Sequence, residues 1–122
     1  MMGMKEIFQK IIIRSMKINI TTKNFDLTPA IREYIQDKMD SLDKFVEEWT
    51  MTGSVEADFD AGRTTNHHNK GNIYYAEVNL KVPGKLLRAQ KTEEDLHAAI
   101  DAVKEVLAEE IKEYKEKLRD NS

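Results

Sequence analysis

The hairpin that decides the fold occupies residues 75–90, which read YAEVNLKVPGKLLRAQ. From Ala76 to Val82 apolar side chains alternate with polar ones, as they do in a strand that buries one face and exposes the other. The alternation resumes at Leu87 and Ala89, and Pro83-Gly84 between the two runs is typical of a tight turn. We therefore expect two neighbouring antiparallel strands.

Two more strands are predicted upstream of this hairpin. Residues 17–21 (KINIT) and 55–60 (VEADFD) both alternate polar and apolar side chains. We expect the four strands to form an antiparallel sheet with one polar face. The stretch from Ala61 to Asn72 is rich in Gly, Asn and Thr, and we expect it to be a long loop between the second and third strands.

Helices are predicted where the apolar period lengthens. Thr28 is a good N-cap and Pro29 suits the first helical position, so we expect one helix from Pro29 to about Glu48. Thr92 is expected to cap a second helix, whose apolar positions run from Leu96 to Leu118. The order β-α-β-β-β-α predicts an α+β two-layer sandwich, in which two helices pack on one face of a four-stranded sheet.

The composition suits one domain. The chain has 122 residues, 40% of them hydrophobic, and no cysteine, which excludes a disulfide scaffold and a Cys-ligated metal site. We expect the domain to span residues 16–119, with a tail at 120–122. Residues 1–15 form an N-terminal extension, either a short amphipathic docking helix or a loosely held segment. No apolar run is long enough for a secretion signal or a membrane span, so we expect a cytoplasmic protein without a membrane partner.

The net charge of −3 argues at first sight against a nucleic-acid partner. The charge is unevenly distributed, however: residues 1–23 carry five basic side chains and one acidic one, and residues 63–91 carry six and one. Residues 26–60 and 92–122 carry ten acidic side chains each, against three and five basic ones. The sequence is therefore compatible with a basic surface on an acidic protein.

One flank of the second helix is basic. At 100° per residue, an arc of about 80° contains Lys104, Lys112, Lys115 and Arg119, and Asp101 is the one acid within it. The functional interpretation is a phosphate-binding stripe, and the alternative is a solvated helix with weak ion pairs between turns. Lys38 in the first helix lies beside apolar positions, where it either contacts a phosphate or packs its stem along the helix edge.

Other kinds of chemistry are not indicated. His67-His68 lies in the predicted loop without a fixed third ligand, so we expect no metal site. The acids of the second strand are expected to pair across the sheet with Lys81 or Arg88 instead of acting as catalytic carboxylates. The sequence has no nucleophile triad, Gly-rich phosphate loop or zinc-hydrolase pattern, so we expect no enzymatic activity, cofactor or small-molecule substrate.

Several motifs along the chain resemble those of one known family. TPAIREY at 28–34, followed by Lys38, is similar to the first helix of the ribosome hibernation-promoting factor and ribosome-associated inhibitor family. YAEV at 75–78, LLRA at 86–89 and DLHAAID at 95–101 resemble the signature that leads into the last helix of that family. The resemblance covers about residues 16–119, and its motifs follow the predicted order of elements.

The resemblance implies a non-enzymatic translation regulator that acts under stress. Members of the family bind the small ribosomal subunit in the channel used by mRNA and tRNA, and they inactivate or preserve idle ribosomes. Basic side chains face the phosphates of the rRNA. The positions that match basic residues of the family are Arg32, Lys38, Lys44, Arg88, Lys115 and Lys117. The basic flank adds Lys104, Lys112 and Arg119 as candidate rRNA-binding residues.

The end of the chain at Ser122 implies a short form of the family, without the C-terminal dimerisation domain of the long form. The resemblance leaves the oligomeric state open. The alternative function is a small protein-interaction module that does not bind ribosomes.

Overall fold

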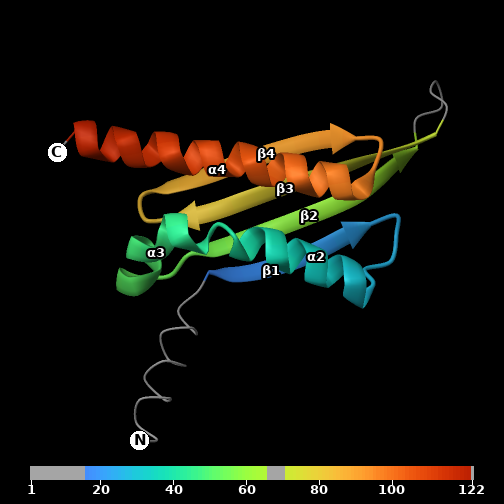
Figure 1. Ribbon diagram of the computed structural model, residues 1–122, viewed down its shortest axis with the longest axis horizontal. Coiled ribbons are helices and arrows are strands. Elements are labelled where there is room, and N and C mark those ends of the chain that lie inside the picture. The colour runs from blue at the N-terminus through green and yellow to red at the C-terminus, as the bar shows by residue number, and fades with distance from the viewer. Residues whose placement is uncertain (1–15, 66–70, 122) are drawn as a thin grey trace, which may run out of the picture.

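The computed structural model describes residues 16–65 and 71–121. It confirms the expected α+β class, because a four-stranded sheet is covered on one face by helices (Figure 1). The elements in chain order are β1 (Lys17–Lys23), α2 (Pro29–Asp40), α3 (Asp43–Thr52), β2 (Glu56–Thr65), β3 (Asn72–Val82), β4 (Lys85–Glu93) and α4 (Leu96–Asp120). The N-terminal extension predicted at residues 1–15 lies outside the described residues.

The sheet has the order β1-β2-β3-β4. β2, β3 and β4 are antiparallel, as expected, with Phe59 opposite Val78 and Val78 opposite Ala89. β1 and β2 are parallel, which corrects the expectation of an antiparallel sheet throughout. The connection is the reason: α2 and α3 form a crossover that carries the chain back along the sheet, so β2 runs in the same direction as β1.

The first predicted helix is in fact two helices, α2 and α3, so the described part of the chain has three helices instead of two. At the junction the Ser41 hydroxyl donates to the Lys38 carbonyl at 2.5 Å, and the Leu42 N–H bonds to the Met39 carbonyl, three residues back, at 3.0 Å. This tighter turn changes the helical phase and leaves Met39 and Leu42 fully buried. Phe45, which continues the apolar period of the predicted helix, is 40% exposed as a result.

β2 continues to Thr65, through residues that were predicted to form a loop. Tyr75 stands opposite Gly62 in the register, and a Cβ on Gly62 would lie 2.3 Å from the tyrosine ring. The ring therefore covers the glycine on the sheet face away from the helices. Gly62 marks a close side-chain approach within a strand and not a turn.

The N-cap of α4 is Asp95, not the predicted Thr92, which belongs to β4. The Asp95 carboxylate accepts a hydrogen bond from the Ala98 N–H at 3.0 Å. The predicted cap of α2 is confirmed, since the Thr28 hydroxyl accepts from the Ile31 N–H at 3.2 Å.

The core lies between the sheet and the helices. Phe59 and Leu80 from the sheet are almost fully buried in the same apolar cluster as Leu107 of α4, and burial of each such side chain stabilises the fold by ~1.5–3 kcal/mol. α4 packs over β3 and β4, with α2 and α3 beside it (Figure 1). On the opposite, polar face Lys81 pairs with Glu56 at 3.7 Å and with Asp58 at 4.0 Å, which confirms the predicted cross-strand pairing to Lys81.

Candidate nucleic-acid interface

α4 runs alongside α2 and α3 (Figure 1), and all three helices carry basic residues. We call this region the helical seam and define it by Lys38 on α2, Lys44 on α3, and Lys104, Lys112, Lys115 and Arg119 on α4. Two direct links between helices, one from Lys38 and one from Lys115, show that the basic flank of α4 faces its neighbours. The seam therefore contains six of the nine predicted rRNA-binding residues.

Lys38 links α2 to Asp101 of α4. Its Nζ lies 3.2 Å from Asp101 Oδ1, and the Tyr34 hydroxyl donates a 2.6 Å hydrogen bond to the same oxygen. The Lys38 ammonium also lies 5.4 Å from the centre of the Tyr34 ring. The one acid of the basic arc is thus partnered, and the Lys38 side chain keeps 36% of its surface exposed at the helix edge.

The hydrogen bond between Tyr34 and Asp101 shifts the pKa of both groups. The bond to the carboxylate, together with desolvation and the negative charge of Asp101, raises the pKa of Tyr34 to about 12. For Asp101, desolvation acts to raise the pKa, but hydrogen bonds from Tyr34 and Lys38 and the positive charge of Lys38 outweigh it, so the pKa falls below its ordinary value. The Asp101 carboxylate therefore stays ionised at neutral pH and holds α2 to α4.

Lys115 links α4 to α3. Its ammonium donates a 2.7 Å hydrogen bond to the Phe45 carbonyl and lies 3.1 Å from Glu48 Oε1. It also lies 5.7 Å from the centre of the Trp49 ring, which in turn packs at a tilt against Tyr114. Lys115 therefore contributes to packing as well as to the positive charge of the seam.

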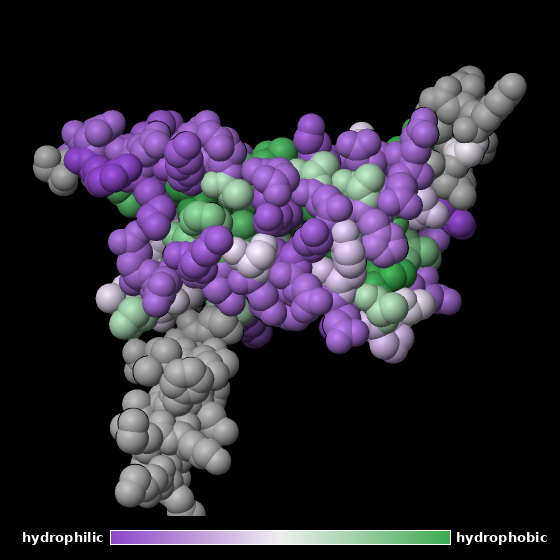
Figure 2. Space-filling model, viewed as in Figure 1, coloured by the Kyte–Doolittle hydropathy of each residue, from purple (hydrophilic) through white to green (hydrophobic). Residues whose placement is uncertain are grey.

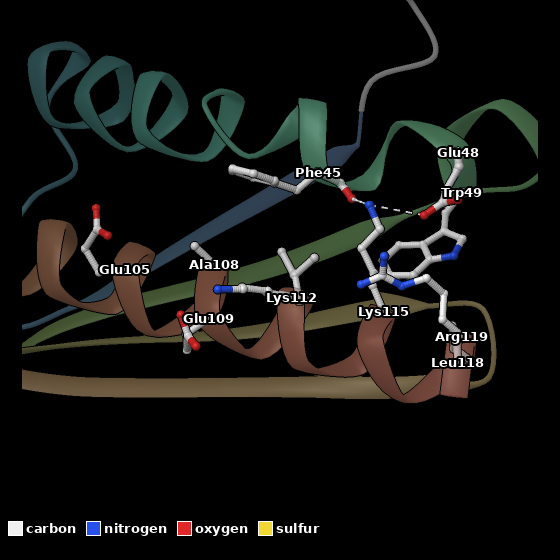
Figure 3. A pocket seen from close by; sticks show the side chains of 11 residues that line it. Phe45, Glu48, Trp49, Glu105, Ala108, Glu109, Lys112, Lys115, Leu118 and Arg119 are labelled. Atoms are coloured by element: carbon white, nitrogen blue, oxygen red, sulfur yellow. Dashed lines mark hydrogen bonds and ion pairs between the residues drawn. The ribbon is translucent and has the colours of Figure 1, made fainter. Parts of the chain in front are cut away.

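A groove of about 750 Å³ opens between α3 and the C-terminal half of α4 (Figure 3). Phe45 and Trp49 line it from α3, and Ala108 and Leu118 line it from α4. Figure 2 shows apolar groups gathered between these two helices on a face that is otherwise mainly hydrophilic. The groove combines an aromatic wall with a floor that a small residue, Ala108, keeps open.

Charged side chains of both signs line the same groove. The cations are Lys112, Lys115 and Arg119, and the acids are Glu48, Glu105 and Glu109. Two acids are already neutralised, because Glu48 pairs with Lys115 and Glu105 pairs with Lys104 at 3.0 Å. Lys112 is exposed and has no hydrogen-bond or ion-pair partner within residues 16–65 and 71–121. Its ammonium is the cation most available to an anionic partner.

The remaining candidates are Lys44, which belongs to the seam, and three residues outside it. Lys44 Nζ lies 5.1 Å from the centre of the Phe45 ring. Arg88 and Lys117 line a separate hollow of about 290 Å³ beside β4. Arg32 is exposed on α2, and helical spacing places it on the flank opposite Lys38, with the buried face between them.

Phe45 and Ala108 line the groove although the sequence did not single them out. Phe45 fits the buried face of a single long helix, and its exposure depends on the junction before α3. Its neighbour Val46 competes for the same face and is fully buried. Two features of the sequence could have indicated the groove. Phe45 and Val46 are adjacent, so both cannot occupy the buried face, and a small residue, Ala108, lies inside the basic arc.

Within residues 16–65 and 71–121, no group of three or more His, Cys, Asp or Glu is placed to hold a metal ion. His67-His68 lies outside the described part of the chain. No described helix is long and apolar enough to cross a membrane.

Comparison with known proteins gives matches over nearly the whole domain. A family described as "Sigma 54 modulation protein / S30EA ribosomal protein" matches residues 18–119. The ribosome hibernation promotion factor of Lactococcus lactis is 32% identical over 107 residues, which cover 84% of this chain and 51% of that protein. The ribosome hibernation promoting factor of Klebsiella oxytoca is 29% identical over 104 residues, which cover 85% and 98%. The chain thus spans about half the length of some curated relatives, and nearly all of another.

Solved structures show the same fold. The N-terminal domain of Thermus thermophilus Protein Y superposes with a TM-score of 0.65 at 26% identity, over 82% of this chain and 98% of that one. A ribosomal subunit interface protein from Coxiella burnetii superposes with a TM-score of 0.63 at 23% identity and supports the fold alone.

Proposed function

Because the chain belongs to the sigma 54 modulation protein / S30EA ribosomal protein family, we propose that it binds the small ribosomal subunit through the helical seam and keeps idle ribosomes inactive. The proposed site is the channel used by mRNA and tRNA, so that a bound chain excludes both. The names of the Lactococcus lactis and Klebsiella oxytoca relatives support a role in ribosome hibernation. This function is cytoplasmic and needs no catalytic step.

The observation that carries the proposal is the collection of six cations along one seam of a protein with a net charge of −3. Lys112 is free to pair with a phosphate. Lys38 and Lys115 have internal partners, yet 36% and 33% of their side chains stay exposed, so each can also contact an anion. Such contacts with phosphates supply affinity and fix orientation without reading sequence.

The links between the helices support recognition by shape. The Tyr34–Asp101–Lys38 contacts hold α2 to α4, and the Lys115 contacts hold α3 to α4. Lys38 and Lys115 are therefore presented in a fixed arrangement, which suits a folded rRNA whose phosphates are themselves fixed. We place Arg32, Arg88 and Lys117 outside the seam, at the margin of the proposed contact surface.

Co-sedimentation with purified small subunits tests the proposal. Binding should be strong at low salt and weaken steeply as salt rises, with a log–log slope of about −0.7 to −0.9 for each phosphate neutralised. Lys112→Glu should weaken binding and reduce that slope. Lys91→Glu, an equal charge change at an exposed position of β4 outside the seam, is the matched control and should bind as the unchanged chain does. Absence of binding at low salt would refute the proposal.

A competition experiment tests the channel separately. Small subunits loaded beforehand with mRNA and tRNA should bind the chain much less than empty subunits do. Equal binding to loaded and empty subunits would exclude the channel, although binding to the subunit itself would still stand.

A further inference from the structure

The groove between α3 and α4 has features that phosphate binding alone does not require. Two large apolar residues that line it, Phe45 and Leu118, are 40% and 44% exposed, so the groove presents an apolar surface to solvent. Figure 3 shows Phe45 on the α3 side and Lys112 on the α4 side, with Ala108 between them. The volume of about 750 Å³ lies within the ~300–1,000 Å³ in which proteins commonly hold small organic groups.

The charged side chains that line the groove restrict which kinds of ligand can bind there. Glu48 and Glu105 are paired internally, whereas Lys112 and Glu109, which also lines the groove, have no hydrogen-bond or ion-pair partner among the residues that the structure describes. The ammonium of Lys44 lies 5.1 Å from the centre of the Phe45 ring. The groove therefore offers an apolar, aromatic surface with one available cation, Lys112, at its border.

A nucleotide with an unstacked base has the matching chemistry. Its flat base can stack on an aromatic ring, and its phosphate can pair with a lysine at the edge of the stack. The bases of a duplex cannot do so, because their faces are already stacked on one another. A phosphate without a base leaves the apolar walls uncovered.

We infer that the groove accepts an unpaired base of single-stranded RNA, with the base against Phe45 and above Ala108 and a neighbouring phosphate on Lys112. This inference rests on the proposed function, and it adds a base-binding subsite to a surface that otherwise recognises phosphates. It implies that the seam prefers regions of rRNA in which a base is flipped out or looped.

Trp49 provides the readout, because it is the single tryptophan of the chain and lines the groove. Titration with a short oligoadenylate should change its fluorescence and give saturable binding. At equal phosphate concentration, a GC-rich RNA duplex and linear polyphosphate should bind about tenfold more weakly. Equal binding of all three probes would overturn the inference, because it would show that charge alone governs binding.

Two substitutions test the contact with the base. Ala108→Leu fills the floor of the groove without removing a cation and should weaken oligoadenylate binding about tenfold. Ala102→Leu, on the same helix but outside the groove, is its matched control. Phe45→Leu keeps an apolar side chain but loses the aromatic face, so it should bind oligoadenylate more weakly than Phe45→Trp. If Ala108→Leu binds as its control does, the base does not enter the groove.

The same proteins separate this inference from the proposed function and from another occupant. Small-subunit binding without oligoadenylate binding would remove the base subsite and leave the proposed function standing. Oligoadenylate binding without small-subunit binding would support the base subsite and refute the proposed function. Self-association in sedimentation velocity that Ala108→Leu abolishes would assign the groove to a second copy of the chain and overturn the inference.

Discussion

Asp101 is an acid in the middle of a basic flank, and its contacts explain how it fits there. Its carboxylate accepts a hydrogen bond from the Tyr34 hydroxyl at 2.6 Å and pairs with Lys38 at 3.2 Å. The negative charge of Asp101 therefore helps to hold α2 to α4. The same ion pair neutralises part of the positive charge of Lys38. At the scale of residues, the seam is therefore a compromise between holding the helices together and presenting cations.

Tyr34→Phe tests this contact through its pH dependence. The substitution should destabilise the fold by ~1 kcal/mol near pH 8, since it removes one hydrogen bond to a charged group at a partly exposed site. Folding raises the pKa of Tyr34 from about 10 to about 12, so its contribution is complete below pH 10 and is lost as pH rises towards 12. Urea unfolding of both proteins should show the difference shrinking over that interval, and a constant difference would contradict the assignment.

At low pH, the dependence of stability on pH has the opposite sign. Folding lowers the pKa of Asp101, so its stabilising contribution is present above the ordinary carboxyl pKa of about 4 and is lost as pH falls through the lowered value. The stability difference between the unchanged chain and Tyr34→Phe should therefore also shrink in acid.

Lys112 and Lys115 should respond differently to charge reversal. Lys112→Glu should change the free energy of unfolding by less than ~0.5 kcal/mol, because the side chain is exposed and unpaired in the described part of the chain. Lys115→Glu should cost ~1–2 kcal/mol, because it removes the bond to the Phe45 carbonyl and places a second carboxylate beside Glu48. Urea unfolding followed by circular dichroism measures both, and equal stabilities would contradict the structural role of Lys115.

At the scale of elements, two of the wrong sequence-based predictions, the single long helix and the loop at Gly62, have their cause in side-chain packing. The junction at Ser41 and Leu42 lies within an uninterrupted apolar period, and no Gly or Pro marks it. The helix breaks here because the break buries Leu42 in the core. That burial depends on tertiary packing. Gly62 gave a loop signal for a similar reason, since only the folded sheet shows that the Tyr75 ring needs its space.

Gly62 and Tyr75 should behave as a coupled pair. Gly62→Ala should destabilise the fold by ~1–2 kcal/mol, because the new Cβ displaces the ring of Tyr75. In the background of Tyr75→Ala the same substitution should cost much less. Urea unfolding of the four proteins of this double-mutant cycle measures the coupling, and additive effects would show that the ring does not need the space above Gly62.

At the scale of the whole molecule, the fold could be read from the sequence more completely than the site. Alternation in the strands, the cap at Thr28 and the amphipathic last helix predicted a helix-covered four-stranded sheet, because burial acts on those periods directly. The basic flank of α4 was also visible at helical spacing. The groove was not, because it depends on how α3 turns after its junction and on Phe45 becoming exposed there.

The net charge of −3 conceals the arrangement of charge in space. Acids lie on the open sheet face, where Glu56 and Asp58 pair with Lys81, and six cations lie along the helical seam. This separation predicts that the molecule approaches rRNA with its helices foremost and its sheet turned away.

Lysine footprinting tests that orientation most directly. The chain, alone and bound to purified small subunits, is treated briefly with an amine-acetylating reagent, and the extent of modification at each lysine is measured by mass spectrometry. Lys112 and Lys44 should become protected on binding, whereas Lys81 on the open sheet face and Lys91 on β4 should react as before. Protection of Lys81 with undiminished reactivity at Lys112 would contradict the account and place the ribosome on the opposite face of the molecule.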